Sequence, residues 1–160
     1  KAAGARVVKS PVKEIGWCDV DFNQEALTDP LFNHFSSKEK LFQLHGDTFA
    51  IPDSATKLAS SELCGSQAFR YGKKVYGMQF HLEVDEAMIH RWLSYESNLR
   101  DIESMNGAVT IDQINADTSK YIQNSIDLSL QTFTKFVVLL GLPKRPIALG
   151  SGHGSPKKSI

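Results

Sequence analysis

A change of hydrophobic pattern near residue 85 is the feature that most limits the fold of this chain. Before it, short runs rich in Val, Ile, Phe and Tyr alternate with Gly and Pro turn signals, which is typical of β-strands. After it, apolar residues recur three and four positions apart, as they do along one face of an α-helix. The sequence therefore predicts an α/β chain with strands first and helices later, which suits the back half of an α/β domain better than a complete fold.

Strands are expected through the first 80 residues. The apolar runs predict them at 6–22 (two short strands joined near Pro11), 41–44, 56–62, 67–71 and 75–80. The residues at 71–74, Tyr-Gly-Lys-Lys, predict the hairpin turn between the last two strands.

Two amphipathic helices are expected after residue 85. The first has Asp85 at its start, where a carboxylate suits the positive end of a helix. The second ends at Gly141. Its apolar stripe consists of Ile122, Ile126, Leu130, Phe133, Val137 and Leu140. We expect the domain's own sheet to cover this stripe, and a homodimer through this helix is the alternative.

Composition and charge exclude several classes of function. Lys and Arg number 18 and Asp and Glu number 18, so the zero net charge gives no general attraction to nucleic acid or to an anionic membrane. The longest apolar run, at 136–140, is far too short to span a bilayer. Two cysteines, Cys18 and Cys64, cannot build a disulfide framework and indicate a reducing, cytoplasmic environment. No metal-ligand spacing, phosphate loop or dinucleotide fingerprint occurs, so we assign no metal and no cofactor.

His45 and His81 stand out among the five histidines because each directly follows an apolar strand, where an α/β sheet presents its functional ends. Positions two apart in an extended backbone face the same side, so His81 and Glu83 can be neighbours. A carboxylate beside an imidazole fixes its tautomer and stabilises its charged form, as in the base half of a nucleophilic triad. Taken alone, a surface ion pair explains the same spacing.

A series of spaced motifs surrounds these two histidines. In order they are Val-Lys-Glu-Ile-Gly-Trp at 12–17, Leu-His-Gly-Asp-Thr-Phe at 44–49, Gln-Ala-Phe-Arg-Tyr-Gly at 67–72 and Gly-Met-Gln-Phe-His-Leu-Glu at 77–83. Together they resemble class I glutamine amidotransferase domains, especially the stand-alone type similar to the amidotransferase domain of GMP synthase. The resemblance covers roughly residues 1–95, and residues 100–160 resemble no named family.

The resemblance implies a flavodoxin-like α/β fold, incomplete at the N-terminus and with extra C-terminal helices. It also implies a Cys-His-Glu triad in which the histidine and the glutamate are His81 and Glu83. Leu82 replaces the proline that the family usually has between them, and proline contributes no reacting atom. The segment that lies near bound glutamine in the family corresponds to His45, Gly46 and Asp47.

The cysteine of the triad is expected upstream of residue 1. In the family it lies in a Gly-x-Cys-x-Gly elbow before a helix that typically ends in residues like those at 1–5. Cys64 lacks the leading glycine of the elbow and falls between strands, and Cys18 fits a small buried hydrophobe. We therefore expect the C-terminal part of an amidotransferase-like domain at 1–95, a helical extension packing on it at 96–142 and a flexible tail at 143–160.

The activity that the resemblance implies is hydrolysis of the glutamine side-chain amide to glutamate and ammonia, with a synthase partner that accepts the ammonia. Without an upstream cysteine, this chain is expected to be inactive by itself. Two alternatives stay open: a γ-glutamyl peptidase of the same fold, and a non-catalytic relative that binds or regulates.

Overall fold

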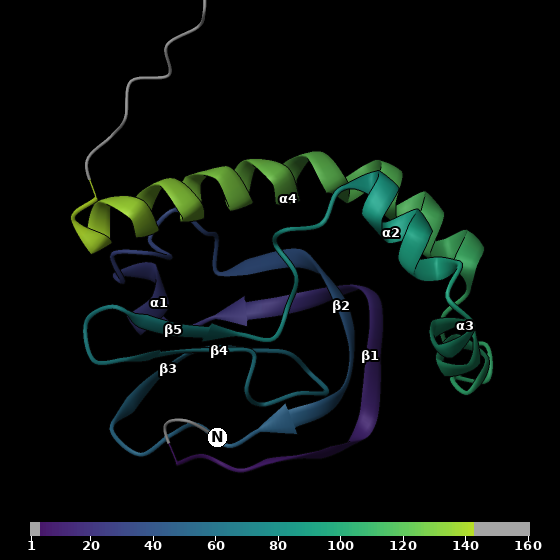
Figure 1. The fold of residues 1–160 in the computed structure, drawn as a ribbon, viewed down its shortest axis with the longest axis horizontal. Coiled ribbons are helices and arrows are strands. Elements are labelled where there is room, and N and C mark those ends of the chain that lie inside the picture. Colours follow the sequence, from purple (N-terminus) through teal and green to yellow (C-terminus); the bar gives the residue numbers. More distant parts are fainter. Residues whose placement is uncertain (1–3, 143–160) are drawn as a thin grey trace, which may run out of the picture.

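A bent antiparallel sheet makes up the first half of the described chain, and helices make up the second (Figure 1). The computed structural model describes residues 4–142. Its strands are β1 (Val7–Phe22), β2 (Lys38–Phe49), β3 (Ala55–Ser60), β4 (Ala68–Tyr71) and β5 (Val75–Met78), and its helices are α1 (Gln24–Leu27), α2 (Glu86–Leu93), α3 (Glu96–Glu103) and α4 (Ile111–Leu140).

The strand order in the sheet is β2-β1-β3-β4-β5, and the ladders between these strands are antiparallel. The parallel strands of a flavodoxin-like sheet are therefore not seen among residues 4–142. The tail expected at 143–160 lies outside the described residues.

β1 is one continuous strand, whereas the sequence predicts two short ones. Pro11 lies where the pairing with β2 shifts, between Lys9 and Glu14. A proline has no N–H to give to a ladder, so this irregularity accommodates it without ending the strand. The prediction of two strands is wrong because the chain pairs on both sides of the shift, and β1 and β2 bend together as a ribbon (Figure 1).

β2 is longer than the strand predicted at 41–44, because β1 pairs with it on both sides of this segment. As a result His45 lies inside β2, opposite Glu14. The prediction that His45 follows the end of a strand is therefore wrong. The later strands and their hairpin are confirmed as β3, β4 and β5, with Gly72 at φ +61° in the turn.

The two predicted helices are confirmed, and α3 lies between them without having been predicted. Asp85 caps α2, where its side chain accepts a hydrogen bond from the Met88 N–H at 2.7 Å. α4 ends at Gly141, whose φ of +76° is the left-handed conformation that terminates many helices. None of the described helices combines the length and the apolar character needed to cross a bilayer.

α4 turns a different face to the sheet from the one that its apolar stripe predicts. Its buried residues are Ile114, Thr118, Ser125, Leu128 and Thr132. In the predicted stripe, Ile126, Leu130, Phe133 and Leu140 are 39%, 66%, 66% and 37% exposed. The expectation that the sheet covers this stripe is wrong for these four residues. The hydroxyl groups of Thr118 and Thr132 can face the sheet because the helix satisfies them, as they donate to carbonyls one turn earlier at 2.7 and 2.8 Å.

Two apolar clusters form the core. The first packs phenylalanines of β1 and of the loop after α1 against Leu128 of α4. The second packs Trp17 and Phe42 against α2, α3 and the first half of α4. Phe80 belongs to the first cluster, and the next residue, His81, bonds through its backbone to Phe42 of the second. His81 therefore lies where the two clusters adjoin.

Candidate functional site

His81 and Glu83 are brought together in the structure, as their spacing suggests. His81 Nδ1 lies 2.7 Å from Glu83 Oε1. The segment is held by an isolated antiparallel bridge to β2, in which the His81 N–H donates to the Phe42 carbonyl at 2.9 Å. The side chains of His81 and Glu83 are 26% and 59% exposed, so both reach solvent.

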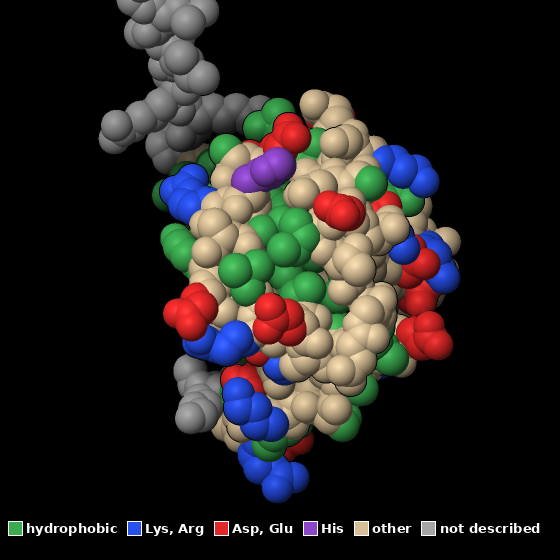
Figure 2. Space-filling model, turned by 90° about the vertical axis from the view of Figure 1, so that its right-hand side faces the viewer, with side chains coloured by type: hydrophobic (Ala, Val, Ile, Leu, Met, Phe, Trp, Pro, Cys, Tyr) green, Lys and Arg blue, Asp and Glu red, His purple; other side chains and the backbone are tan. Residues whose placement is uncertain are grey.

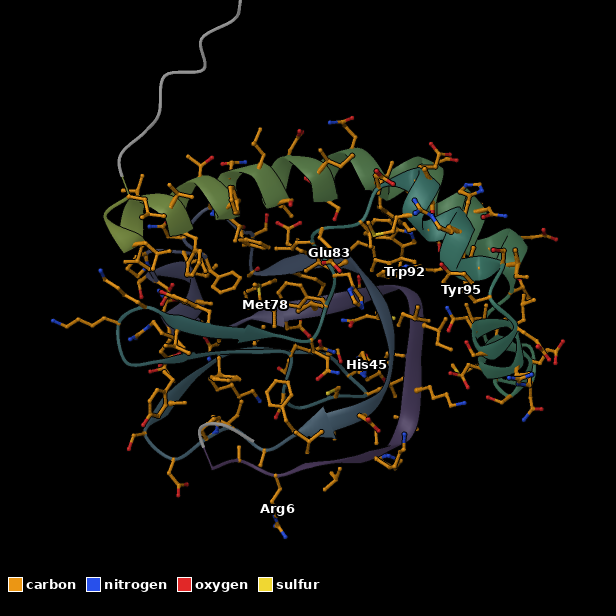
Figure 3. The ribbon with its side chains drawn as sticks, viewed as in Figure 1. Arg6, His45, Met78, Glu83, Trp92 and Tyr95 are labelled. Atoms are coloured by element: carbon orange, nitrogen blue, oxygen red, sulfur yellow. The ribbon has the colours of Figure 1, made fainter. Side chains whose placement is uncertain are left out.

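Aromatic side chains restrict the plane of the His81 ring. Trp92 of α2 meets it edge to face, with ring centroids 4.9 Å apart and planes at 72°. Phe42 lies further away, at 6.4 Å between centroids. Figure 3 labels Glu83 and Trp92, which approach the ring from two consecutive segments of the chain. With Nδ1 bonded to Glu83, the nitrogen left to exchange a proton is Nε2, for which residues 4–142 supply no hydrogen bond.

A second histidine–glutamate pair lies inside the sheet. His45 Nε2 is 3.1 Å from Glu14 Oε2, and the two side chains are only 8% and 2% exposed. At this distance the two groups form an ion pair when the imidazole is protonated, and the angles of the contact are not those of a hydrogen bond. The other ring nitrogen, Nδ1, donates to the backbone carbonyl of Asp47 at 3.0 Å. Both nitrogens of His45 are thus engaged within the chain.

The segment at 45–47 lies beside the segment at 79–83. The Gln79 side chain donates from Nε2 to the Asp47 carbonyl at 3.1 Å. The Asp47 carboxylate is half exposed and pairs with Lys9 at 2.9 Å. Of the three residues expected near bound glutamine, Gly46 is half-buried and Asp47 exposed, while the imidazole of His45 points inward.

Glu14 is a candidate site residue that the sequence analysis misses. It accepts hydrogen bonds from Ser61 Oγ at 2.6 Å and from Gln67 Nε2 at 2.7 Å, in addition to facing His45. Burial alone would raise the pKa of this carboxyl, but the contacts with His45, Ser61 and Gln67 outweigh burial and hold the pKa below its ordinary value. A carboxylate followed directly by the apolar run Ile15-Gly16-Trp17 in a strand is the signal that could have found it, because a carboxylate drawn into the core needs buried partners.

Neither cysteine forms a hydrogen bond with His81 in the described structure. Cys64 is 4% exposed, and its Sγ lies 3.2 Å from Thr48 Oγ1 and 3.6 Å from the Ser66 carbonyl. Cys18 is half-buried in β1, where burial, and then the charge of Glu14, raise the pKa of its thiol to about 12. Each thiol is therefore held by neighbours other than the His81–Glu83 pair.

A groove of about 570 Å³ opens beside the His81–Glu83 pair, between β5 and α4. Met78 and Glu83, which Figure 3 labels, both line it, together with Phe133 and Phe136 of α4. On the face seen from the α3 end of the molecule, acidic and basic side chains are interspersed around an apolar area (Figure 2). Residues 4–142 contain no group of three or more His, Cys, Asp or Glu that could hold a metal ion.

Curated relatives of the chain are glutamine amidotransferase-like proteins and GMP synthases. The chain is 42% identical over 83 residues to the glutamine amidotransferase-like protein YfeJ of Salmonella typhimurium, covering 52% of the chain and 35% of that protein. It is 30% identical over 126 residues to a glutamine-hydrolyzing GMP synthase of Caldanaerobacter subterraneus, covering 77% and 24%. It is 34% identical over 86 residues to one subunit of the glutamine-hydrolyzing GMP synthase of Methanococcus vannielii, covering 52% and 44%. The chain thus spans less than half the length of these relatives, and no family model matches it.

Two solved structures share the fold. A glutamine amidotransferase from Thermotoga maritima matches with a TM-score of 0.72 and 28% identity, over 84% of this chain and 56% of its own. One from Methylobacillus flagellatus matches with a TM-score of 0.74 and 25% identity, over 97% and 61%. The predicted fold class is confirmed, and residues 4–142 contribute a bent antiparallel sheet and the C-terminal helix to it. Sequence and structural relatives together show that the chain is similar to class I glutamine amidotransferases.

Proposed function

We propose that His81 and Glu83 are the base and the orienting carboxylate of a cysteine-dependent glutamine amidotransferase. The observation that carries this proposal is the 2.7 Å contact between His81 Nδ1 and Glu83 Oε1, which leaves Nε2 without a hydrogen bond among residues 4–142. A carboxylate in this place selects the tautomer and stabilises the imidazolium that forms during proton transfer. The GMP synthase relatives, which are named as glutamine-hydrolyzing enzymes, support the same reaction.

The reaction follows from these roles. His81 Nε2 takes the proton of a cysteine thiol, and the thiolate attacks the side-chain amide carbon of glutamine. The imidazolium then gives its proton to the departing nitrogen, which leaves as ammonia while the remaining γ-glutamyl group stays on the sulfur as a thioester. A water molecule, deprotonated by His81, cleaves the thioester to glutamate and restores the thiol. Gly46 and Asp47 are proposed to contact the substrate, and the bond from Gln79 Nε2 to the Asp47 carbonyl, which ties their segment to the one that carries His81, supports this.

The proposed nucleophile is neither Cys18 nor Cys64. Cys18 is a poor source of thiolate, because its pKa is raised to about 12. Cys64 is buried against Thr48 and Ser66 and is not hydrogen-bonded to His81. We therefore assign the thiolate to a cysteine outside the 160-residue sequence. A working thiolate requires a reducing compartment, for which the cytoplasm is the proposed place.

Two partners belong to the proposal. The methanococcal relative is named as one part of a GMP synthase, which supports a synthase that accepts the ammonia. A second copy of the chain, bound through the exposed stripe of α4, is the other proposed partner, because Leu130 and Phe133 are each 66% exposed.

A γ-glutamyl peptidase is the second candidate activity. The groove beside His81 and Glu83 favours it, since an apolar wall that includes Phe133 and Phe136 has room for a leaving amine larger than ammonia. The two activities differ in the leaving group alone, so comparing glutamine with γ-glutamyl dipeptides as substrates distinguishes them.

The test is glutamine hydrolysis by the full-length gene product, comparing three variants. His81→Ala should lower kcat at least about 100-fold, because the cysteine loses its base and the leaving group its acid. Glu83→Gln should cost less, because it weakens the orientation of the ring without removing the proton acceptor. His90→Ala is the matched control: His90 also faces a glutamate, Glu86, at 3.7 Å, but on the exposed side of α2.

Full activity in His81→Ala would reject the triad. If the wild-type protein binds glutamine but hydrolyses neither glutamine nor γ-glutamyl dipeptides, the result would support the non-catalytic alternative.

A further inference from the structure

We propose that the buried carboxylate of Glu14 is a positioning residue for His81 and acts through Gln67 and His45, from which hydrogen bonds lead to the backbone and side chain of Gln79, two residues before His81. This inference rests on the proposed function only in taking His81 as the base. The positioning itself is a property of the described fold, and it can be measured without any activity.

The first step is the chemistry of Glu14 itself. A buried carboxylate is costly to desolvate and is tolerated only when its oxygens are satisfied. Oε1 accepts from Ser61 Oγ at 2.6 Å, and Oε2 accepts from Gln67 Nε2 at 2.7 Å and faces His45 Nε2 at 3.1 Å. Glu14 therefore fixes three side chains that come from two other segments of the chain.

The first route from Glu14 to the site passes through Gln67. This residue is fully buried, and its side-chain oxygen accepts a hydrogen bond from Gln43 Nε2 at 3.1 Å. Its backbone carbonyl accepts from the Gln79 N–H at 2.8 Å. Gln67 thus connects the two sites: its side chain contacts Glu14, and its backbone carbonyl holds Gln79.

The second route passes through His45. Its Nδ1 faces a carbonyl oxygen, which can only accept, so this nitrogen carries a proton and donates to Asp47 at 3.0 Å. The same Asp47 carbonyl accepts from Gln79 Nε2 at 3.1 Å. The orientation of the imidazole against Glu14 therefore sets the place of the carbonyl that Gln79 binds.

Three hydrogen bonds hold the segment that presents His81. Two are the bonds of Gln79 to Gln67 and to Asp47, and the third joins the His81 N–H to the Phe42 carbonyl. Two of the three thus lead to residues that are in or next to the Glu14 cluster. A misplacement of about 1 Å at a reacting group can cost on the order of 100-fold in rate. The hydrogen bonds that fix the backbone next to His81 therefore matter for its role as a base.

The experiment measures amide hydrogen exchange and the imidazole ¹⁵N resonances of His81 by NMR in the 160-residue chain. Glu14→Gln keeps the volume and removes the charge and one acceptor, so it leaves no cavity. Relative to the wild type, we expect the substitution to accelerate amide exchange at Gln79 and His81 by a factor at least about 10 times larger than at Ile89, whose N–H is held in α2. We also expect the ¹⁵N resonances of the His81 ring to shift.

The matched control is Ile102→Ala, which removes a buried side chain of α3 outside this network. It should destabilise the fold but raise exchange without preference for Gln79 and His81, and it should leave the ring resonances in place. Equal behaviour of Glu14→Gln and Ile102→Ala would overturn the proposal.

A second variant covers the case in which Glu14→Gln fails to fold. Gln79→Met cuts only the bond to the Asp47 carbonyl and leaves the buried cluster intact. The His81 resonances should move in this variant too, and unchanged resonances would reject the route through His45. If positioning is observed while His81→Ala stays active in the full-length product, the proposed function fails and the positioning role stands.

Discussion

Glu14 keeps its charge where a carboxylate would ordinarily be neutral. Its side chain is 2% exposed, and burial alone would raise its pKa, yet the contacts with His45, Ser61 and Gln67 bring the pKa below the usual 4.5. A carboxyl whose pKa is lowered by folding binds protons less readily in the folded state than in the unfolded chain. Glu14 therefore stabilises the fold at neutral pH, and this contribution is lost as the pH falls below 4.5 and through the folded-state pKa.

Comparing the wild type with Glu14→Gln isolates this contribution. At about pH 5.5 the substitution should lower the free energy of unfolding by about 1–3 kcal/mol, because two buried donors lose a charged acceptor. The difference should shrink at a second pH below 4.5, because the wild-type carboxyl gains protons as the pH falls through its folded-state pKa. His45 and Cys18 are the other titratable groups that face Glu14. Because the wild type and Glu14→Gln both contain them, the comparison isolates the substituted carboxyl. Urea unfolding at the two pH values gives the measurement, and a difference that does not change with pH would contradict the lowered pKa.

The two histidine–glutamate pairs differ in how far sequence reasoning can reach them. His81 and Glu83 are two residues apart on one extended segment, so local geometry is enough to bring them together. Glu14 and His45 come from different strands, and their contact depends on the register between β1 and β2. A slip of one residue in that register would turn each side chain to the opposite face of the sheet. Nothing local in either strand specifies this register, and so the buried pair escapes prediction.

Among the secondary-structure elements, α4 shows where a periodic pattern stops being informative. The period of its apolar residues predicts a helix, and Thr110 and Gly141 cap it at its two ends. The period does not say which face meets the sheet. The structure buries Thr118, Ser125 and Thr132, whose small side chains let the helix backbone approach the strands. Trp17 Nε1 even donates to Thr118 Oγ1 at 2.9 Å, a partner that the helix sequence alone cannot reveal.

Two leucines on α4 test this orientation directly. Leu128 is 5% exposed and packs in the first core cluster, whereas Leu130 is 66% exposed. Leu128→Ala should lower the free energy of unfolding by about 2–4 kcal/mol through lost burial and the cavity left behind. Leu130→Ala should change it by less than about 0.5 kcal/mol, since a surface substitution away from special features costs little.

Chemical denaturation of the two variants provides the measurement for these leucines, and each variant serves as the control for the other. Equal losses, or a larger loss in Leu130→Ala, would mean that the helix buries the stripe that its sequence predicts.

At the scale of the whole molecule, the order of strands and helices follows from the sequence, while the arrangement of its surfaces does not. The change of pattern near residue 85 marks the passage from the sheet to the helices. The exposed stripe of α4 and the groove beside His81 share Phe133, so a protein that covers the stripe also reaches the site. This link between surface and site arises only when α4 lies across the sheet, a placement that depends on contacts between distant segments (Figure 1).

The 160-residue chain by itself should release no ammonia from glutamine, although it contains His81 and Glu83. An imidazole with its carboxylate can move protons, but without a thiolate beside the substrate no thioester forms. With its pKa at about 12, Cys18 supplies a thiolate in only about one molecule in 10,000 at pH 8. Cys64 is buried, and its Sγ is hydrogen-bonded to the Thr48 hydroxyl and to the Ser66 carbonyl. Residues of a triad act as a unit, so the absence of one removes nearly all of the rate that the set provides.

Ammonia release is measured with the wild-type chain and with Cys18→Ser and Cys64→Ser as controls. Background release should be the same in all three proteins, because neither sulfur takes part. A turnover that survives purification and is lost in Cys64→Ser would show that Cys64 reaches the His81–Glu83 pair. The loop at 61–67 would then have to move, because the Cys64 N–H donates to Ser61 Oγ, and Ser61 and Gln67 are both hydrogen-bonded to Glu14. In that case Glu14→Gln, which loosens the same loop, should raise the activity, whereas an enzyme with an external thiolate should lose activity when Glu14 is changed.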